Sequence, residues 1–315
     1  MDSEILLDLS TVGQVGVIGE CMLELSEFSA DSPDLKKLSF GGDTLNTAVY
    51  LARSGANVHY FTAVGDDTHS RWMIRQWQRA GVQCDHVVQV AGRVPGLYMI
   101  DTDPEGERSF CYWREHSPAR ELFEKHGQAD QIFKALAQFD LIYLSGVTLS
   151  LYSDTALERL LVFLTTFRQE GGLVAFDGNY RPQGWARKSR AQSVYTRFYR
   201  QVDIALPTLE DEVALFDLAD ATALFELLGH FEVAEIVVKQ GGQGCLLQVE
   251  GGLQAVPAIV VDDVIDTTGA GDSFNAGYLS ARLNGEPGVV AAQNGHRYAA
   301  QVVCQRGAIV PIKIG

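Results

Sequence analysis

The sequence predicts an α/β fold: a doubly wound, mainly parallel sheet with helices on both faces and a small separate β-sheet. Three observations lead to this prediction. Short apolar strands alternate with amphipathic helical segments, glycines follow several of those helices, and two strand-like stretches interrupt the alternation. With 315 residues, 46% of them hydrophobic, the chain can bury the large core that such a fold needs.

The elements of the large sheet follow from apolar periodicity and from stop signals. Gly55, Gly81 and Gly171 end helices, because glycine readily adopts the backbone conformation that closes a helix. Between such signals, short apolar runs predict strands buried on both faces. Strands are expected at 15–19, 58–64, 141–144, 173–176, 204–206 and 235–239, and helices at 44–54, 70–80, 132–137, 153–169, after Leu209 and at 289–303.

Two stretches depart from this alternation. Residues 21–40 and 87–113 carry alternating polar and apolar residues and turn signals without a helix, which predicts strands of a small separate sheet. Inserted above a doubly wound core, such a sheet would form a lid that excludes water. Surface hairpins without a lid role are the alternative. The expected domains are therefore an N-terminal extension at 1–14 and one domain at 15–315 that contains both lid segments.

Charge and cysteine usage exclude several classes of protein. The formal net charge is −15, which argues against nucleic-acid or membrane-surface partners, because both require a basic face. The five cysteines are odd in number and lack metal-ligand spacing, so reduced thiols are expected. No apolar stretch approaches the roughly 18 to 20 residues of a membrane span. We expect a cytoplasmic protein.

The segment from Asp266 to Phe274 is the strongest functional signal. Gly269 and Gly271 precede apolar residues at helical spacing, so the turn lies at a helix N-terminus. Free amides and the positive end of the helix dipole suit a phosphate oxygen there. The same dipole favours an ionised Asp272 that can accept a proton. On spacing alone, an ordinary capped helix fits equally well.

Two motifs together carry a resemblance to a known family. Nearly the whole chain resembles the ribokinase-like (phosphofructokinase-B type) carbohydrate kinases. The resemblance rests on the segment Phe40-Gly41-Gly42-Asp43-Thr44-Leu45-Asn46 and on residues 266–272. Residues 19–26, 97–98, 112–114 and 177–182 are most similar to the 2-dehydro-3-deoxygluconate kinases within that family. The resemblance implies a ribokinase-like fold and ATP-dependent phosphorylation of the terminal (6-) hydroxyl of a sugar acid.

The resemblance also implies roles for individual residues. Asp272 matches the catalytic base, and the turn Gly269, Ala270 and Gly271 matches the anion hole. The residues implied to contact the sugar acid are Gly42, Asp43, Asn46, Tyr98, Tyr112, Arg114, Arg181 and Asp272. Arginine suits the carboxylate of such a substrate, because its N–H groups match carboxylate geometry. Without the resemblance, the aromatic residues of Tyr112-Trp113-Arg114 would be interpreted as lid packing and the arginine as a solvated charge. Trp113 is expected to point to the opposite face of its strand from its two neighbours and to serve in packing.

The nucleotide side is implied in the same way. Lys239-Gln240-Gly241-Gly242-Gln243-Gly244 resembles the family's Lys-x-Gly-x-x-Gly segment, although the same letters also fit an ordinary hairpin turn. It is neither a Walker A loop nor a dinucleotide fingerprint. The implied ATP contacts are Asn179, Arg181, Lys239, Gly241, Gly242, Gly244, Gly269, Ala270, Gly271, Asn294, Ala299 and Val303.

Magnesium is expected because the phosphates of ATP carry it into such sites. There it is usually held by water and by few protein carboxylates. The family's Asn-x-x-Glu motif, which orders this ion through water, is changed here: Thr208 and Asp211 stand in place of its two residues. Asp211 is the residue expected to contact the magnesium ion through water, and Glu210 and Glu212 are the alternatives. The simpler interpretation is that these acidic residues form a solvated first helical turn, stabilised by the helix dipole. Asp266 is expected to organise a monovalent-cation loop (K⁺), to contact the sugar, or only to cap its turn.

The expected ligands are therefore a small sugar acid and ATP, and we expect a homo-oligomer formed through the lid. Two alternatives remain open. The chain could be a fructokinase or a 5-dehydro-2-deoxygluconokinase of the same fold, or a sugar sensor without catalytic activity. The presence of Asp272 argues against the sensor.

Overall fold

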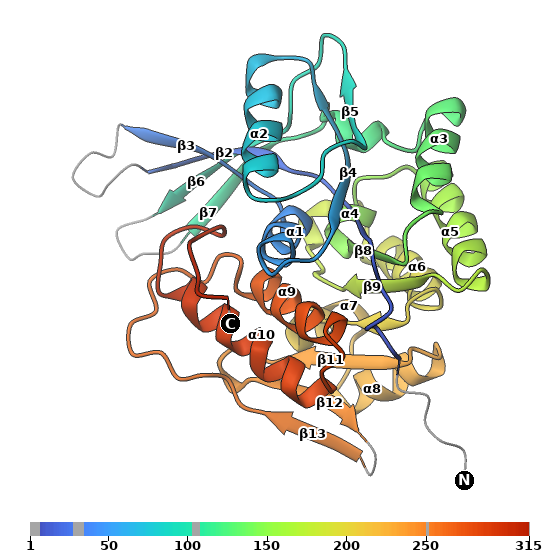
Figure 1. Ribbon diagram of the computed structural model, residues 1–315, viewed down its shortest axis with the longest axis vertical. Coiled ribbons are helices and arrows are strands. Elements are labelled where there is room, and N and C mark those ends of the chain that lie inside the picture. Colours follow the sequence, from blue (N-terminus) through green and yellow to red (C-terminus); the bar gives the residue numbers. More distant parts are fainter. Residues whose placement is uncertain (1–6, 28–34, 103–107, 250–251, 315) are drawn as a thin grey trace.

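The computed structural model describes residues 7–27, 35–102, 108–249 and 252–314. In this part of the chain, helices pack on both faces of a large sheet, and a four-stranded sheet projects from one end (Figure 1). The expected α/β architecture is confirmed. No helix among the described residues is long and apolar enough to cross a bilayer.

Nine strands form the large sheet in the order β13-β12-β11-β10-β9-β8-β1-β4-β5. Neighbouring strands from β5 to β11 run parallel, and β11, β12 and β13 pair antiparallel. Parallel strands end at one edge, which is where ligands bind in open α/β sheets. The bounds are β1 Val15–Ile18, β4 Val58–Gly65, β5 Val87–Val90, β8 Leu141–Ser145, β9 Leu173–Asp177, β10 Ile204–Ala205, β11 Glu235–Lys239, β12 Cys245–Val249 and β13 Gly252–Val256.

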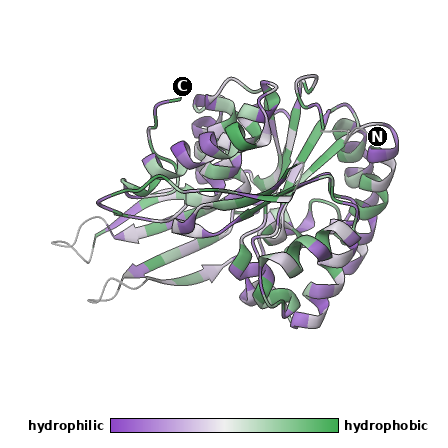
Figure 2. Cartoon of the chain, turned by 90° about the horizontal axis from the view of Figure 1, so that it is seen from below, coloured by the Kyte–Doolittle hydropathy of each residue, from purple (hydrophilic) through white to green (hydrophobic). Residues whose placement is uncertain are grey.

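The helices divide between the two faces. One hydrophobic cluster joins the sheet to α3 to α8, and a second joins it to α1, α2, α9 and α10. Figure 2 shows the hydrophobic residues, in green, concentrated on strands between the helical layers. The helices are α1 Asp43–Arg53, α2 Thr68–Arg79, α3 His126–Leu136, α4 Gly146–Leu149, α5 Asp154–Gln169, α6 Lys188–Tyr199, α7 Leu209–Phe216, α8 Ala221–His230, α9 Ala270–Leu283 and α10 Gly288–Val303, with short 3₁₀ turns η1 Pro118–Glu121, η2 Pro182–Gly184 and η3 Gly241–Gln243.

The small sheet has the order β3-β2-β6-β7 and is called the lid below. Its strands are β2 Met22–Glu27, β3 Lys36–Gly41, β6 Leu97–Thr102 and β7 Arg108–Trp113. Both predicted stretches supply strands to it, but one part of the prediction was wrong. Val87–Val90 pairs in parallel with β4 and belongs to the large sheet. The alternation of polar and apolar residues predicts a strand and leaves its partner undetermined.

Part of the expected N-terminal extension packs against the end of α9. Leu9 is fully buried, and the backbone oxygen of Leu7 accepts a hydrogen bond of 2.6 Å from Arg282. Residues 1–6 lie outside the described part of the chain.

Candidate active site

The glycine turn lies at the N-terminus of α9. Gly269 has φ 76°, a left-handed conformation, and a Cβ placed on it would lie 2.9 Å from atoms of Ala308, so glycine is required for two reasons. Gly271 lies in the first helical turn, and a Cβ on it would meet only the Lys239 ammonium, at 3.6 Å. Gly271 therefore presents uncrowded backbone at a helix N-terminus, the geometry expected of an anion hole.

Asp272 lies in the same first turn and is held by α1. Its Oδ2 accepts a hydrogen bond of 2.8 Å from Asn46 Nδ2, and its backbone oxygen accepts one of 3.2 Å from Thr47 Oγ1. Burial, followed by the charge of Asp43, raises the pKa of Asp272 to about 7. This corrects the expectation of a fully ionised carboxylate. A pKa near neutrality suits a general base.

Asp43 brings a second carboxylate to the same place. Asn179, which follows β9 with a left-handed φ of 39°, donates a hydrogen bond of 2.8 Å to Asp43 Oδ2. Burial raises the pKa of Asp43 above its ordinary value. Helix α1 thus supplies Asp43 and Asn46 to one cluster with Asp272 and Asn179, although 226 positions separate Asn46 from Asp272.

A buried ionic cluster supports the glycine turn from below. Lys239 Nζ donates to Asp177 Oδ2 at 3.1 Å and to Asn275 Oδ1 at 3.0 Å, and Asn275 Nδ2 donates to Asp177 at 2.7 Å. Lys239 is only 7% exposed, so its ammonium lies beneath the turn. Its predicted contact with ATP stays a prediction. Sequence reasoning gave no role to Asp177 or Asn275, although Asp177 ends a buried strand and Asn275 lies one helical turn after Asp272.

The remaining expected ATP contacts lie on the turn after β11 and on α10. Gly242 has open space where a Cβ would stand, whereas Gly244 (φ 106°) has the backbone of Val256 there. Asn294 Nδ2 donates to the Gly277 backbone oxygen at 2.7 Å, and the Val303 oxygen accepts from Ile265 N at 2.8 Å. Ala299 is partly buried. The roles of these residues in binding ATP stay predictions.

The lid residues form an aromatic and ionic group. Tyr98 donates its hydroxyl to Glu24, and its ring centroid lies 5.9 Å from that of Tyr112. The Arg114 guanidinium stands 6.0 Å from the Tyr112 ring centroid and pairs with Glu20. Trp113 lies on the opposite face from Tyr112, as expected, but the expected packing is not found within this chain, because Trp113 is 53% exposed.

Arg181 and the acidic start of α7 meet beside this group. Arg181 Nη1 pairs with Asp211 at 2.9 Å. Glu212 is fully buried, accepts a hydrogen bond of 2.7 Å from Tyr199, and has its pKa raised to about 8 by burial. The acidic turn is therefore not uniformly solvated, and the choice among Glu210, Asp211 and Glu212 as the metal contact stays a prediction. Thr208 precedes α7 as its N-cap residue.

Asp266 connects two backbone segments. Its Oδ1 accepts from Thr268 N at 2.9 Å, and its Oδ2 accepts from Gly307 N at 2.8 Å. It is 6% exposed, so the capping role is supported by these contacts.

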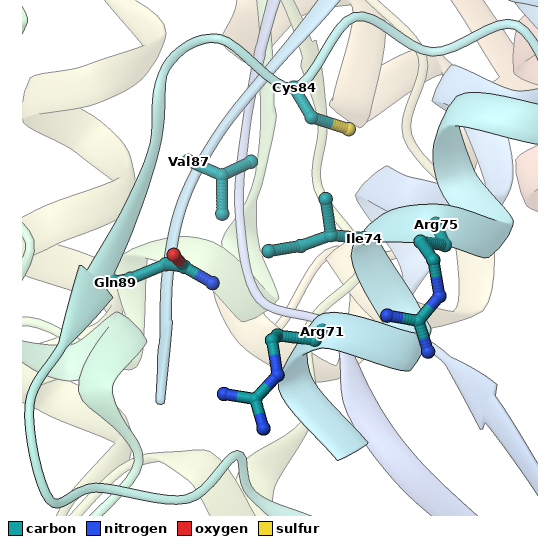
Figure 3. A pocket seen from close by; sticks show the side chains of 6 residues that line it. All are labelled: Arg71, Ile74, Arg75, Cys84, Val87 and Gln89. Atoms are coloured by element: carbon teal, nitrogen blue, oxygen red, sulfur yellow. The ribbon is translucent and has the colours of Figure 1, made fainter. Parts of the chain in front are cut away.

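Other features lie outside this cluster. A hollow of about 300 Å³ between α2 and β5 is lined by none of the expected site residues (Figure 3); its lining is Arg71, Ile74, Arg75, Cys84, Val87 and Gln89. Within the described chain, no group of three or more His, Cys, Asp or Glu side chains could hold a metal ion.

Comparison with known proteins gives a consistent picture. The model of the pfkB family of carbohydrate kinases matches residues 13–314. The 2-dehydro-3-deoxygluconokinase of Dickeya dadantii (strain 3937) is 44% identical over 310 residues, covering 96% of this chain and 98% of that protein. A fructokinase of Vibrio alginolyticus is 26% identical over 274 residues, with coverage of 85% and 84%. The crystal structure of 2-dehydro-3-deoxygluconokinase from Thermotoga maritima superposes with a TM-score of 0.83 at 20% identity, covering 96% and 95%.

Proposed function

Because this chain belongs to the pfkB family of carbohydrate kinases, we propose that it phosphorylates the 6-hydroxyl of 2-dehydro-3-deoxy-D-gluconate with ATP, giving 2-dehydro-3-deoxy-6-phosphogluconate. The observation that carries the proposal is the Asp272 carboxylate, held by Asn46 beside the glycine turn Gly269–Gly271, where Gly271 is uncrowded. The identity to 2-dehydro-3-deoxygluconokinases exceeds that to the fructokinase, which favours this substrate.

The chemistry follows from that geometry. The substrate hydroxyl oxygen attacks the γ-phosphorus, the bond from that phosphorus to the β–γ bridging oxygen breaks, and ADP leaves. Asp272 accepts the hydroxyl proton as the new bond forms. The backbone N–H groups at Gly269 to Gly271 stabilise the charge on the transferring phosphoryl group, which is the largest contribution expected of such a site.

The lid and the loop after β9 are assigned to the sugar acid. Arg114 and Arg181 are the proposed contacts of the carboxylate, and Tyr98 and Tyr112 those of the sugar chain. In support of this, burial raises the pKa of Tyr112, and the positive charges of Arg114 and Arg181 both oppose that rise. The three side chains therefore border one region. Arginine is the residue best matched to a carboxylate, because its planar N–H groups can donate in pairs.

ATP supplies the phosphoryl group, and Mg²⁺ carried by its phosphates neutralises their charge. The donor set fits an ion held mainly by ATP and water, since the described residues include no group of three or more His, Cys, Asp or Glu side chains that could hold a metal ion. Asp211 is the proposed water-mediated contact; its side chain is 20% exposed and faces Arg181. The segment that Asp266 ties to Gly307 is the proposed place of a monovalent cation such as K⁺.

We also propose a cytoplasmic homo-oligomer formed through the lid. By strand register, Leu23, Leu25, Leu38, Leu97, Met99 and Trp113 share one face of the lid, called its outer face below. Leu38 is 40% exposed and Trp113 is 53% exposed. Covering these side chains would remove apolar surface from water. We propose that the outer face of a second copy of this chain covers them, because most oligomers of identical chains are symmetric.

Steady-state kinetics tests the proposed function. Purified protein with Mg-ATP should turn over the keto acid far faster than fructose or ribose. Asp272→Asn should lower kcat by about 10²-fold to 10⁴-fold, because it removes the general base, while ATP binding persists. A higher kcat/KM for fructose would identify a fructokinase, and the absence of turnover with any sugar would favour a sensor.

A further inference from the structure

Glu20 is a buried carboxylate for which the reaction described above has no use. It stands two residues after β1, at the edge of the sheet where ligands bind, and is 4% exposed. Its Oε2 pairs with Nη2 of Arg114, the residue directly after lid strand β7. The pair therefore joins the core to the lid at the proposed site.

The position of Glu20 is fixed by close backbone packing. A Cβ on Gly42 would lie 2.1 Å from the Glu20 backbone oxygen, so the start of α1 rests against this residue. A Cβ on Gly96 would lie 3.2 Å from Glu20 Oε1 and 3.3 Å from Arg114 Cβ. Glu20 thus contacts two proposed sugar-acid residues, Gly42 through its backbone and Arg114 through its side chain.

The pair has unused hydrogen-bonding capacity. Glu20 Oε1 and Arg114 Nε are both buried without a partner among the described residues. The Glu20 side chain is 2% exposed and that of Arg114 is 19% exposed, so solvent reaches only part of the guanidinium. Buried polar atoms are normally satisfied, so unpartnered atoms on both sides of an ion pair mark a place where a further polar group belongs.

An arginine that recognises a carboxylate must be held in place. A free arginine side chain has many rotamers, and binding would otherwise have to overcome the loss of that conformational entropy. A nearly buried guanidinium also needs a counter-charge before the ligand arrives, since an unpaired buried charge is strongly unfavourable. Glu20 meets both needs, because it engages Nη2 and leaves other N–H groups of Arg114 unused.

We propose that Glu20 is a positioning residue for recognition of the sugar acid, holding the Arg114 guanidinium at the junction of core and lid so that its remaining N–H groups can bind the substrate carboxylate. This inference rests on the proposed function and on Arg114 as a contact of the carboxylate. Glu20 acts through Arg114 and takes no part in phosphoryl transfer.

A double-mutant cycle tests the proposal. KM for the sugar acid, KM for ATP and kcat are measured for Glu20→Ala, Arg114→Ala and the double variant. Glu20→Ala should raise KM for the acid about 10-fold or more while changing kcat and KM for ATP less than about 3-fold, and the double variant should be no worse than Arg114→Ala, because residues that act as one unit are not additive. Glu20→Gln should give a KM between those of the wild type and Glu20→Ala, since its amide oxygen still accepts an N–H group but supplies no counter-charge.

Two controls separate recognition from structure. Glu121→Ala removes a more exposed pair, Arg93–Glu121 at 2.8 Å, and should leave KM for the acid unchanged. An analogue with an amide in place of the substrate carboxylate should bind equally to the wild type and to Glu20→Ala. If Glu20→Ala does not fold, Glu20→Met removes the acceptor while keeping similar volume, and the same KM increase is expected.

The outcomes distinguish this inference from the proposed function. An unchanged KM for the acid in Glu20→Ala, with an increase in Arg114→Ala, would overturn it. Additive losses, or equal losses for the acid and the amide, would also overturn it and leave Glu20 as a structural tie of the lid. A wild-type protein that does not phosphorylate the acid would instead refute the proposed function.

Discussion

Asp272 is surrounded by groups that oppose one another. Burial and the carboxylates of Asp43 and Asp177 favour its protonated form, whereas Asn46 and the Lys239 ammonium favour the carboxylate. The result is a pKa of about 7, which places the proposed proton acceptor at the midpoint of its titration near neutral pH. Because only the ionised form accepts a proton, activity should rise with pH through this range.

Asp43→Asn should move that rise to lower pH. It removes a like charge beside Asp272, so the pKa of Asp272 falls and the base is ionised at more acidic pH. The pH profile of kcat/KM measures the effect, even if the substitution also weakens sugar binding. Asp154→Asn alters a carboxylate whose side chain is 86% exposed and should leave the profile in place. An acid limb that stays fixed in Asp43→Asn would contradict the account.

At this scale the sequence could predict residue identities better than their contacts. The glycine turn and Asp272 are recognisable because helix-terminus chemistry is local in sequence. The hydrogen bond from Asn46 spans 226 positions, and the Lys239–Asp177–Asn275 cluster draws on three separate elements, so neither has a local signal. The raised pKa of Asp272 depends on burial, which spacing does not report.

Helices α9 and α10 pack closely against each other. A Cβ on Gly295 of α10 would lie 2.8 to 2.9 Å from Phe274 of α9, including its backbone oxygen, and a Cβ on Gly277 of α9 would lie 2.9 Å from the Asn294 oxygen. Small residues at these points let the two helices pack directly behind the active-site turn. The start of α9, which presents Asp272, therefore depends on α10 for its position.

Gly295→Ala should destabilise the protein by about 1 to 3 kcal/mol, because the added methyl group overpacks a close helix contact. Urea unfolding measures the loss. Gly229→Ala in α8 is the matched control, since a Cβ there meets nothing within 4 Å, and it should be neutral or stabilising by up to about 1 kcal/mol. Equal stability of the two variants would refute tight packing at Gly295.

Element types were easier to predict than element partners. The strand at 235–239 was predicted with its observed bounds, because a continuous apolar run between turn signals has few alternatives. Val87–Val90 was correctly predicted as strand but placed in the wrong sheet, since its pairing with β4 forms across α2 and depends on tertiary packing. Helix α3 begins at His126, six residues before the predicted start, because its first turn lacks a strong apolar pattern.

For the whole molecule, the outer face of the lid makes the oligomeric state testable. Leu38→Glu combined with Trp113→Glu should convert the wild-type oligomer to a monomer in size-exclusion chromatography with light scattering, because charge at the centre of an interface is costly. Val162→Glu changes a residue of α5 that is 59% exposed and should not alter the mass. A monomeric wild type would exclude the proposed assembly.

The lid is also assembled from two distant parts of the chain. Strands β2 and β3 leave the core after β1 and return at α1, whereas β6 and β7 leave after β5 and return at η1. Among the described residues, the two hairpins meet where β2 pairs with β6, as in the pairing of Glu24 with Tyr98, 74 positions apart. Such distant pairing has a high loop-closure cost until the intervening core has folded. The connectivity therefore predicts an order of folding: the core forms first, and the lid, with the proposed surface for the sugar acid, is completed last.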